Sequence, residues 1–291
     1  MSDADILFKR AETRLSKFSL SDICNKNAKY DDAKVLFEKA GRLYKLEKQF
    51  RKAATSFISA SECNKQMQCI DEAIYNYTDA YNCYKHFDKV KAIECANIII
   101  EYYRTEGNST KMITFKKELI DIFDDTMDYD RLLVECKECL EFLSIEKKDC
   151  FVENTVRMKL ANAYIKLNDC LKAGEIYEKM AHEYLERNDV GIKNALRYRA
   201  GDYIFDAAIC YVGEDIVAAE RAIENFIKIQ PSFTMSTEHR CILNLIDAVE
   251  AHNISKFTNC IWDYDKIKPL MNWQVELLNN IKEKMGEVSL I

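Results

Sequence analysis

Small and aromatic residues alternate along one side of a helical pattern that recurs through the chain. Ala73, Tyr77, Ala80 and Tyr84 lie three or four residues apart, so they share one face of a helix with about 3.6 residues per turn. A small residue lets a neighbouring helix approach, and an aromatic ring fills the groove beside it. The same pattern returns in Ala33, Phe37, Ala40 and Tyr44, in Ala53, Phe57 and Ala60, and in Ala173, Tyr177, Met180 and Tyr184.

The spacing of these sets predicts a helical solenoid. The sets that begin at Ala33, Ala53 and Ala73 start about twenty residues apart, so two helices make a repeat of roughly forty residues. Such repeats stack on their neighbours in a continuous array. The unit resembles a tetratricopeptide repeat (TPR) with slightly long helices. We therefore expect an all-α, TPR-like solenoid of antiparallel helical hairpins.

Two clear breaks and short polar turns divide the chain into helices. Gly107 suits the end of a helix, and Pro231 disfavours a helical residue at Gln230. We find no strand-like alternation of useful length. Helices are expected at about 3–15, 30–46, 49–66, 69–86, 88–106, 110–124, 128–146, 149–167, 168–187 and 190–212, between the turn 213–215 and Pro231, and at 235–252, 254–265 and 269–285.

The composition agrees with a folded helical protein and excludes some functions. The 291 residues include only 7 Gly and 2 Pro, and 48% of them are apolar. The net charge of −6 argues against nucleic acid as a partner. No run is long and apolar enough to span a membrane, and the start lacks a signal-peptide pattern. We therefore expect a cytoplasmic protein.

The search for catalytic or metal-binding motifs finds none. There is no glycine-rich phosphate loop, and the four His are scattered singly. Cys136 and Cys139 have the spacing of a metal or redox pair, but they lie in the middle of an expected helix with no second pair. We interpret the 12 Cys as small buried residues in a reducing compartment. The chain is expected to be a binding protein, with no enzymatic activity, cofactor or metal.

The polar connection at 16–29 carries three hydrophobic residues, Phe18, Leu20 and Ile23. One interpretation is that they cover the open end of the first repeat, as a terminal cap must. The other is that they touch a membrane surface. The pattern alone leaves both interpretations open.

Several motifs in order resemble the soluble NSF attachment protein (SNAP) family, above all its alpha type and the yeast counterpart. They are the segments Asp5–Glu12, Tyr30–Tyr44, Leu196–Phe205 and Gln230–Glu238, and Tyr264-Asp265 with Leu270 and Trp273. Each motif is weak alone, but their order and spacing are specific. The chain departs from the family at Gly201 and Thr237, where Lys and Arg are usual, in lacking the glycine-rich stretch of the first loop, and in its less acidic tail.

The resemblance implies one domain over residues 1–291, with about fourteen helices. Residues 1–190 would form a curved TPR-like sheet, 191–285 a C-terminal helical bundle and 286–291 a tail. It also implies an adaptor that binds SNARE four-helix bundles and recruits and activates an NSF-type AAA ATPase in vesicle-mediated transport. Such an adaptor would lie on the cytosolic face of membranes as a peripheral protein. The alternatives are a gamma-type SNAP or a generic TPR-like scaffold for another cytosolic complex.

The resemblance also implies contact residues. SNARE bundles are acidic, so the facing side of an adaptor should be basic. The candidate SNARE contacts are Lys85, Arg104, Lys111, Lys116, Lys117, Arg157, Lys159, Lys166, Arg197, Tyr198 and Arg199. Asp215, Asp247 and Glu250 are expected to dock the ATPase, and Leu290 in the tail is expected to activate it.

Overall fold

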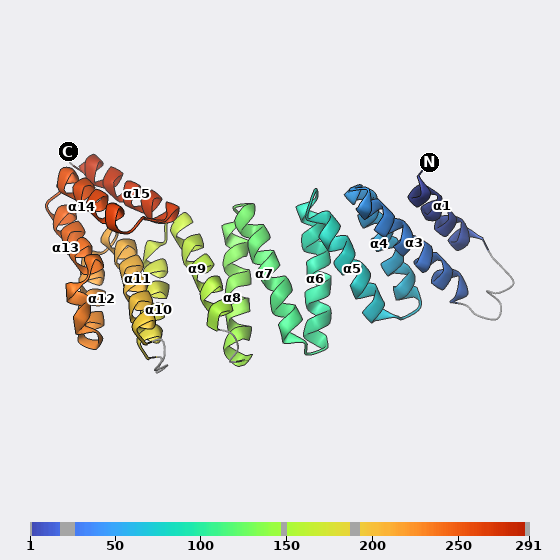
Figure 1. Ribbon diagram of the computed structural model, residues 1–291, viewed down its shortest axis with the longest axis horizontal. Coiled ribbons are helices and arrows are strands. Elements are labelled where there is room, and N and C mark those ends of the chain that lie inside the picture. The colour runs from blue at the N-terminus through green and yellow to red at the C-terminus, as the bar shows by residue number, and fades with distance from the viewer. Residues whose placement is uncertain (1, 18–26, 147–149, 187–192, 289–291) are drawn as a thin grey trace. The chain divides into compact units, whose positions relative to one another are not determined.

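The computed structural model describes residues 2–17, 27–146, 150–186 and 193–288 (Figure 1). Within these ranges the chain is helical, with fourteen α-helices, one 3₁₀ helix and no strand. It divides into two compact units, an N-terminal unit Met1–Asp125 and a C-terminal unit Thr126–Ile291. The expected all-helical, TPR-like fold is confirmed.

The N-terminal unit is a row of helices in which each packs against the next in sequence. Its helices are α1 (Asp3–Ser16), α3 (Ala28–Leu46), α4 (Phe50–Gln66), α5 (Ile70–Tyr84), α6 (Lys89–Thr105) and α7 (Ser109–Asp125). Gly107, Lys48 and Gln68 occupy tight turns between helices with φ near +60° (67°, 58° and 61°). Left-handed residues of this kind reverse the chain within a few positions. Only Gly107 is recognisable from its residue type.

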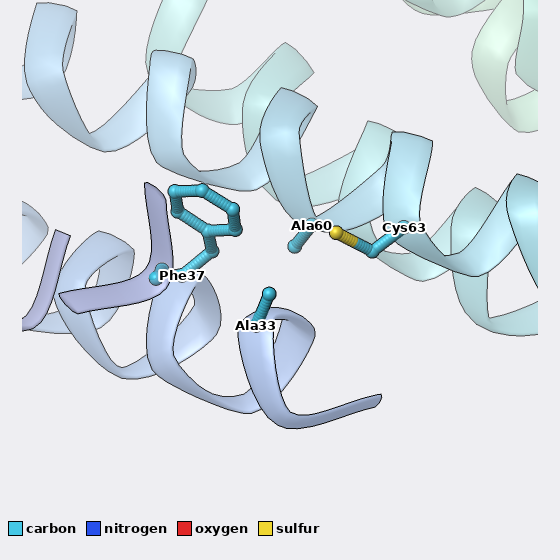
Figure 2. Packing of buried hydrophobic residues seen from close by; sticks show 5 residues of the cluster. Ala33, Phe37, Ala60 and Cys63 are labelled. Carbon is cyan, nitrogen blue, oxygen red and sulfur yellow. The ribbon is translucent and has the colours of Figure 1, made fainter. Parts of the chain in front are cut away.

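The alternation of small and aromatic residues forms the core of this unit. Ala33 and Phe37 of α3 lie against Ala60 and Cys63 of α4 (Figure 2), and Ala11 of α1 completes the cluster. The residues Ala73, Tyr77, Ala80 and Tyr84 are likewise all buried. The face predicted from their spacing is therefore the face that packs.

The C-terminal unit is organised around α11. Its helices are α8 (Tyr129–Glu146), α9 (Cys150–Lys166), α10 (Cys170–Glu186), α11 (Lys193–Val212), α12 (Ile216–Ile229), α13 (Thr237–Glu250), α14 (Ile254–Ile267) and α15 (Asn272–Val288), with the 3₁₀ helix η1 (Pro231–Met235). α11 packs against α10, α12, α13 and α15. Every residue from Tyr203 to Val212 is buried. A helix that is apolar all round is suited to such a central position.

One detail differs from what the pattern predicts. The segment after Pro231 forms η1, which was not expected; the ring of Phe233 in this segment is buried.

The division into a solenoid and a bundle near residue 190 stays a prediction. That position lies between α10 and α11, which pack closely within one unit. The division into two compact units falls between residues 125 and 126.

Replacing Gly174 by Ala should destabilise the C-terminal unit. A Cβ at Gly174 of α10 would lie 2.8 Å from two ring carbons of Tyr211 on α11, well inside contact distance. The ring is buried, and its hydroxyl donates to Glu178 at 2.9 Å, so it has little freedom to move. We expect a loss of about 1–3 kcal/mol in the free energy of unfolding, measured by denaturant titration.

Gly201→Ala is the matched control, since Gly201 also lies inside a helix. There a Cβ meets only the Phe233 ring at 3.6 Å, an ordinary contact. Alanine favours a helix interior by up to about 1 kcal/mol over glycine, so this variant should be unchanged or more stable. Equal effects at the two positions would show that close approach to Tyr211 is not the cause.

Candidate protein-binding site

Two segments that carry sequence motifs, 196–205 and 230–238, line one groove on the C-terminal unit. This α11–η1 groove encloses about 440 Å³. Its walls include Arg197, Tyr198 and Gly201 of α11 and Phe233 and Met235 of η1. Tyr198 and Met235 are 78% and 89% exposed, unusual values for such large side chains. The groove therefore presents an aromatic, an aliphatic and a cationic group to solvent.

Buried residues of the same motifs explain why the groove exists. Phe233 packs edge-on against Phe226 with ring centroids 5.0 Å apart. Ser236 then starts α13, because its Oγ accepts a hydrogen bond from the backbone N–H of His239 at 3.0 Å. Gly201 leaves room for the Phe233 ring on the α11 side.

An ion-pair network stabilises the walls of the groove by joining the segments that form them. Lys268 Nζ donates to Glu238 Oε1 at 3.1 Å and also to Asp202, joining α11, α13 and the segment after α14. Burial opposes ionisation of Glu238, but its own backbone N–H and the Lys268 ammonium outweigh burial and lower the pKa of this carboxyl. One fixed ammonium therefore offsets part of the negative charge of the two acids in the wall.

The expected basic residues of the N-terminal unit are mostly engaged within the protein. Lys85 Nζ lies 2.8 Å from Glu118 Oε2, and Arg104 pairs with Glu101 at 2.7 Å. Lys111 lies over the ring of Tyr103, 4.9 Å from its centroid. Side chains paired in this way offer less charge to a partner than the sequence suggests.

Two further lysines of α7 differ from each other in exposure. Lys116 is only 2% exposed, so its assignment to an exposed basic stripe finds no support in the structure. Lys117, the next residue, is half-buried. A helix turns by about 100° per residue, so Lys116 can face the core while Lys117 lies nearer the surface.

The basic candidates of the C-terminal unit fall into two groups. Arg157 is 14% exposed and pairs with Glu153 at 2.5 Å and with Glu183, which is an internal structural role. Lys159 is half-buried, and Lys166 pairs with Glu276 of α15. By contrast, Arg197, Tyr198 and Arg199 are all exposed at the start of α11. Arg199 makes a long ion pair with Asp202, 3.8 Å, and lies over the ring of Tyr203, 5.7 Å from its centroid.

The acidic candidates lie on helix ends. Asp215 begins α12, where its Oδ1 accepts from the backbone N–H of Ala218 at 3.0 Å. Asp247 and Glu250 are exposed in the last turn of α13, and Asp247 pairs with Lys256 of α14 at 3.1 Å. We call Asp215, Asp247 and Glu250 the acidic end.

The end of α15 connects the segments that carry the acidic end. Lys284 Nζ pairs with Glu214, next to Asp215, at 2.5 Å. A Cβ at Gly286 would lie 3.9 Å from Ile254, the first residue of α14, just beyond the turn that follows Glu250. The α11–α12 turn, the α13–α14 turn and the last turns of α15 therefore meet (Figure 1). Leu290 lies outside the described residues, as do Phe18, Leu20 and Ile23.

The motif residues near the end of the chain hold α15 in place. Trp273 stacks on Tyr177 of α10 with ring centroids 5.5 Å apart and planes within 8°. Gln274 Nε2 donates to the buried Asp206 of α11 at 2.6 Å. Tyr264 stacks on Phe205 at 4.6 Å. These residues are structural, and the sequence motifs that contain them mark packing as much as binding.

The part of the chain that the structure describes contains neither a candidate metal site nor a candidate membrane-spanning helix. Those residues contain no group of three or more His, Cys, Asp or Glu arranged to hold a metal ion. None of the described helices combines the length and apolar character needed to cross a membrane. Cys136 and Cys139 are fully buried, as the interpretation of the cysteines as core residues requires.

Stacked helical hairpins with an exposed aromatic groove and a separate acidic end define a helical-repeat binding protein. A model of the family described as "Soluble NSF attachment protein, SNAP" matches residues 2–286. The chain therefore belongs to the soluble NSF attachment protein family, whose members are adaptors and not enzymes.

Curated relatives match over nearly their whole length. A probable vesicular-fusion protein sec17 homolog of Schizosaccharomyces pombe is 27% identical, with 99% of this chain and 98% of the relative covered. The beta-soluble NSF attachment protein of Bos taurus is 26% identical over 96% of this chain and 92% of its own. The alpha-soluble NSF attachment protein of Saccharomyces cerevisiae is 27% identical over 99% and 98%.

Proposed function

We propose that this chain is the adaptor that binds SNARE four-helix bundles and recruits and activates an NSF-type AAA ATPase, so that the bundles are disassembled after membrane fusion. The family match over residues 2–286 carries the proposal, because it includes both the α11–η1 groove and the acidic end. The relatives' names refer to NSF attachment and to vesicular fusion. The generic-scaffold alternative has no comparable support.

The α11–η1 groove is the proposed centre of the SNARE contact. Arg197 in the wall of the groove and Arg199, exposed nearby on α11, supply positive charge for an acidic helical bundle. Tyr198 and Met235 supply apolar area. Aromatic and arginine side chains are the usual anchors of protein interfaces. Lys159 extends the proposed contact on the C-terminal unit, and Lys111 and Lys117 are proposed contacts on the N-terminal unit. Lys85, Arg104, Arg157 and Lys166 act first within the fold through their acidic partners.

The acidic end is the proposed docking site for the ATPase. Asp215, Asp247 and Glu250 lie on segments joined by the end of α15, so a partner bound there also lies beside the last turns of α15. We assign docking to these acids and activation to Leu290. The peripheral membrane contact is assigned to Phe18, Leu20 and Ile23, on the cytosolic face of a membrane.

Reconstitution with a SNARE complex and an NSF-type ATPase tests the function as a whole. The chain should sediment with the SNARE complex alone, the ATPase should join only when the chain is present, and ATP hydrolysis should then release the SNAREs. Absence of binding to both partners would favour a scaffold for another complex. Binding without release would separate attachment from activation.

A double change in the groove should weaken SNARE binding through charge. We choose Arg197→Glu with Arg199→Gln, because Gln at 199 avoids a second anion beside Asp202. Association should slow by roughly tenfold at low ionic strength, and added salt should bring the wild type toward the variant. The measurement is the association rate as a function of salt concentration.

The matched control is Arg221→Glu with Lys228→Gln, two exposed positions on α12 that give the same change in net charge. A rate loss equal to that of the groove variant would show that total charge, and not the groove, steers binding. Salt-independent association of the wild type would remove the electrostatic account altogether.

A further inference from the structure

Two cysteines from different helices place their sulfur atoms side by side on the C-terminal unit. Cys241 of α13 and Cys260 of α14 have Sγ atoms 3.6 Å apart. The Cys260 thiol also lies 3.4 Å from the backbone oxygen of Cys241, which holds it beside its neighbour. The two residues are 19 positions apart, so no short sequence motif indicates the pair.

The pair is accessible, in contrast to Cys136 and Cys139. Cys241 and Cys260 line a pocket of about 330 Å³ together with Arg240, Asn244 and Tyr264. Cys260 is half-buried and Cys241 is nearly covered, so a small molecule in the pocket reaches Cys260 first. Cys136 and Cys139 are fully buried in α8. Cys241 and Cys260 are therefore both close together and accessible from a pocket, whereas Cys136 and Cys139 are not accessible.

We propose that Cys241 and Cys260 form a reversible disulfide when a hydroperoxide enters this pocket. The closeness of the two sulfur atoms and the opening onto Cys260 carry the proposal. Nothing in the proposed adaptor function assigns a role to either residue.

The hydrogen bond within the pair favours Cys260 as the attacking thiol. Once Cys260 is ionised, the Cys241 thiol donates to its sulfur, which lowers the pKa of Cys260 and raises that of Cys241. Burial and the carboxylate of Asp263 oppose ionisation, and Lys256 favours it. Arg240 lies at the pocket wall, and Glu238 adds negative charge near Cys241. The thiolate is the reactive form of cysteine.

Oxidation of the two cysteines to a disulfide by a hydroperoxide takes two steps. The Cys260 thiolate attacks one oxygen of the peroxide bond, and that bond breaks. Cys260 becomes a sulfenic acid, and the other oxygen leaves as an alcohol or as water once it is protonated. The Cys241 sulfur then attacks the sulfenic sulfur, a disulfide forms, and the hydroxyl leaves as water with the Cys241 proton. One peroxide is reduced for each disulfide, and two equivalents of a small thiol restore both cysteines.

The disulfide would join the two helices next to the acidic end. Asp247 and Glu250 lie on α13, and Asp247 pairs with Lys256 of α14. A bond between Cys241 and Cys260 closes a loop that contains the α13–α14 turn, which restricts the unfolded chain. The oxidised protein should therefore unfold at a higher temperature than the reduced protein.

Treatment of the full chain with hydrogen peroxide tests the proposal without SNAREs or ATPase, so its outcome is independent of the proposed function. We expect a peptide pair linked through Cys241 and Cys260, a loss of two hydrogen atoms from the intact mass, and full reversal by a small thiol. Cys241→Ser should stop the reaction at a Cys260 sulfenic acid that a sulfenic-acid probe labels. Cys260→Ser should leave Cys241 unlabelled.

The variant Cys136→Ser with Cys139→Ser is the control, and it should form the disulfide as the wild type does. A wild-type chain in which Cys69, also half-buried, is oxidised before Cys260 would overturn the proposal. So would a Cys260 sulfenic acid that persists while Cys241 is intact. An oxidised chain that unfolds at the temperature of the reduced chain would overturn the structural consequence.

Discussion

A chain with Asp247→Lys and Glu250→Lys, combined with Asp215→Asn, should bind SNARE bundles but fail to recruit the ATPase. The three acids form the acidic end, the proposed docking site. Reversing two of them places like charge against a basic partner, which costs several kcal/mol, or roughly a hundredfold or more in affinity. Assembly is measured by sedimentation of the ATPase with the adaptor–SNARE complex.

The substitutions are chosen so that folding is preserved. Asn at 215 can accept the same hydrogen bond from the Ala218 N–H as Asp does, so the start of α12 keeps its cap. Asp247 and Glu250 lie in the last turn of α13, where a negative charge opposes the helix dipole and a lysine favours it. The ion pair of Asp247 with Lys256 is exposed, and such pairs contribute about 0–1 kcal/mol.

The control is Glu220→Lys with Glu224→Lys, two exposed acids on α12 of the same unit. Combined with Asp215→Asn, it gives the same net charge as the test variant and should still recruit the ATPase. If both variants fail, charge in general governs the interaction. If both recruit normally, the acidic end is not the docking site, although the SNARE contact would be unaffected by that result.

The variant Asp206→Asn should be more stable than the wild type at pH 8, and the gain should shrink as the pH falls. Asp206 is buried between α11 and α15, and burial raises the pKa of its carboxyl to about 7 although the hydrogen bond from Gln274 opposes the rise. An ordinary aspartate has a pKa of 3.8. Asn is neutral at every pH, and its oxygen can still accept from Gln274.

The gain in stability depends on pH because the pKa of Asp206 is raised in the folded state. A raised carboxyl pKa means that the folded state holds the proton more tightly than the unfolded state, so stability is fully present below the unfolded pKa and is lost as the pH rises through 7. Above pH 7 the wild type keeps a buried charge that costs roughly 2–4 kcal/mol. The gain of the variant should fall by about 1.4 kcal/mol per pH unit below 7.

Denaturant midpoints between pH 5 and pH 8 measure this difference. Asp263→Asn is the control, because Asp263 is exposed and pairs with Lys266 at 3.5 Å. It should show a small effect that varies little with pH. A stability difference for Asp206→Asn that is constant over this range, or a loss of stability at pH 8, would contradict a buried carboxylate as its source.

The helices and the packing face could be predicted because both depend on neighbours in sequence. The buried set Ala73, Tyr77, Ala80 and Tyr84 follows from its spacing, and the break at Gly107 follows from one residue type. The turns at Lys48 and Gln68 could not be predicted in the same way. Their left-handed backbone is imposed by the helices on either side and not by a residue that prefers it.

The candidate site could be predicted in part. Arg197, Tyr198 and Arg199 are exposed, as a contact requires, and the acidic end lies on the surface. The burial of Lys116 and the pairing of Arg157 with two glutamates were missed. The residue type alone does not show whether a lysine such as Lys116 faces the core or the solvent. Glu183 is 26 residues from its partner Arg157, too far along the chain for a local pattern. No local pattern reports either relation.

The stack of helical hairpins and the family could both be inferred from the residues alone, because the helical period, the turn residues and the order of motifs lie along the chain. The charges that remain exposed depend on how the helices pack, since Lys85 meets Glu118 from a different helix. The tertiary structure also decided that α11 and η1 share a groove and that Cys241 meets Cys260. These contacts join residues that are distant in sequence, and their geometry depends on how the helices pack.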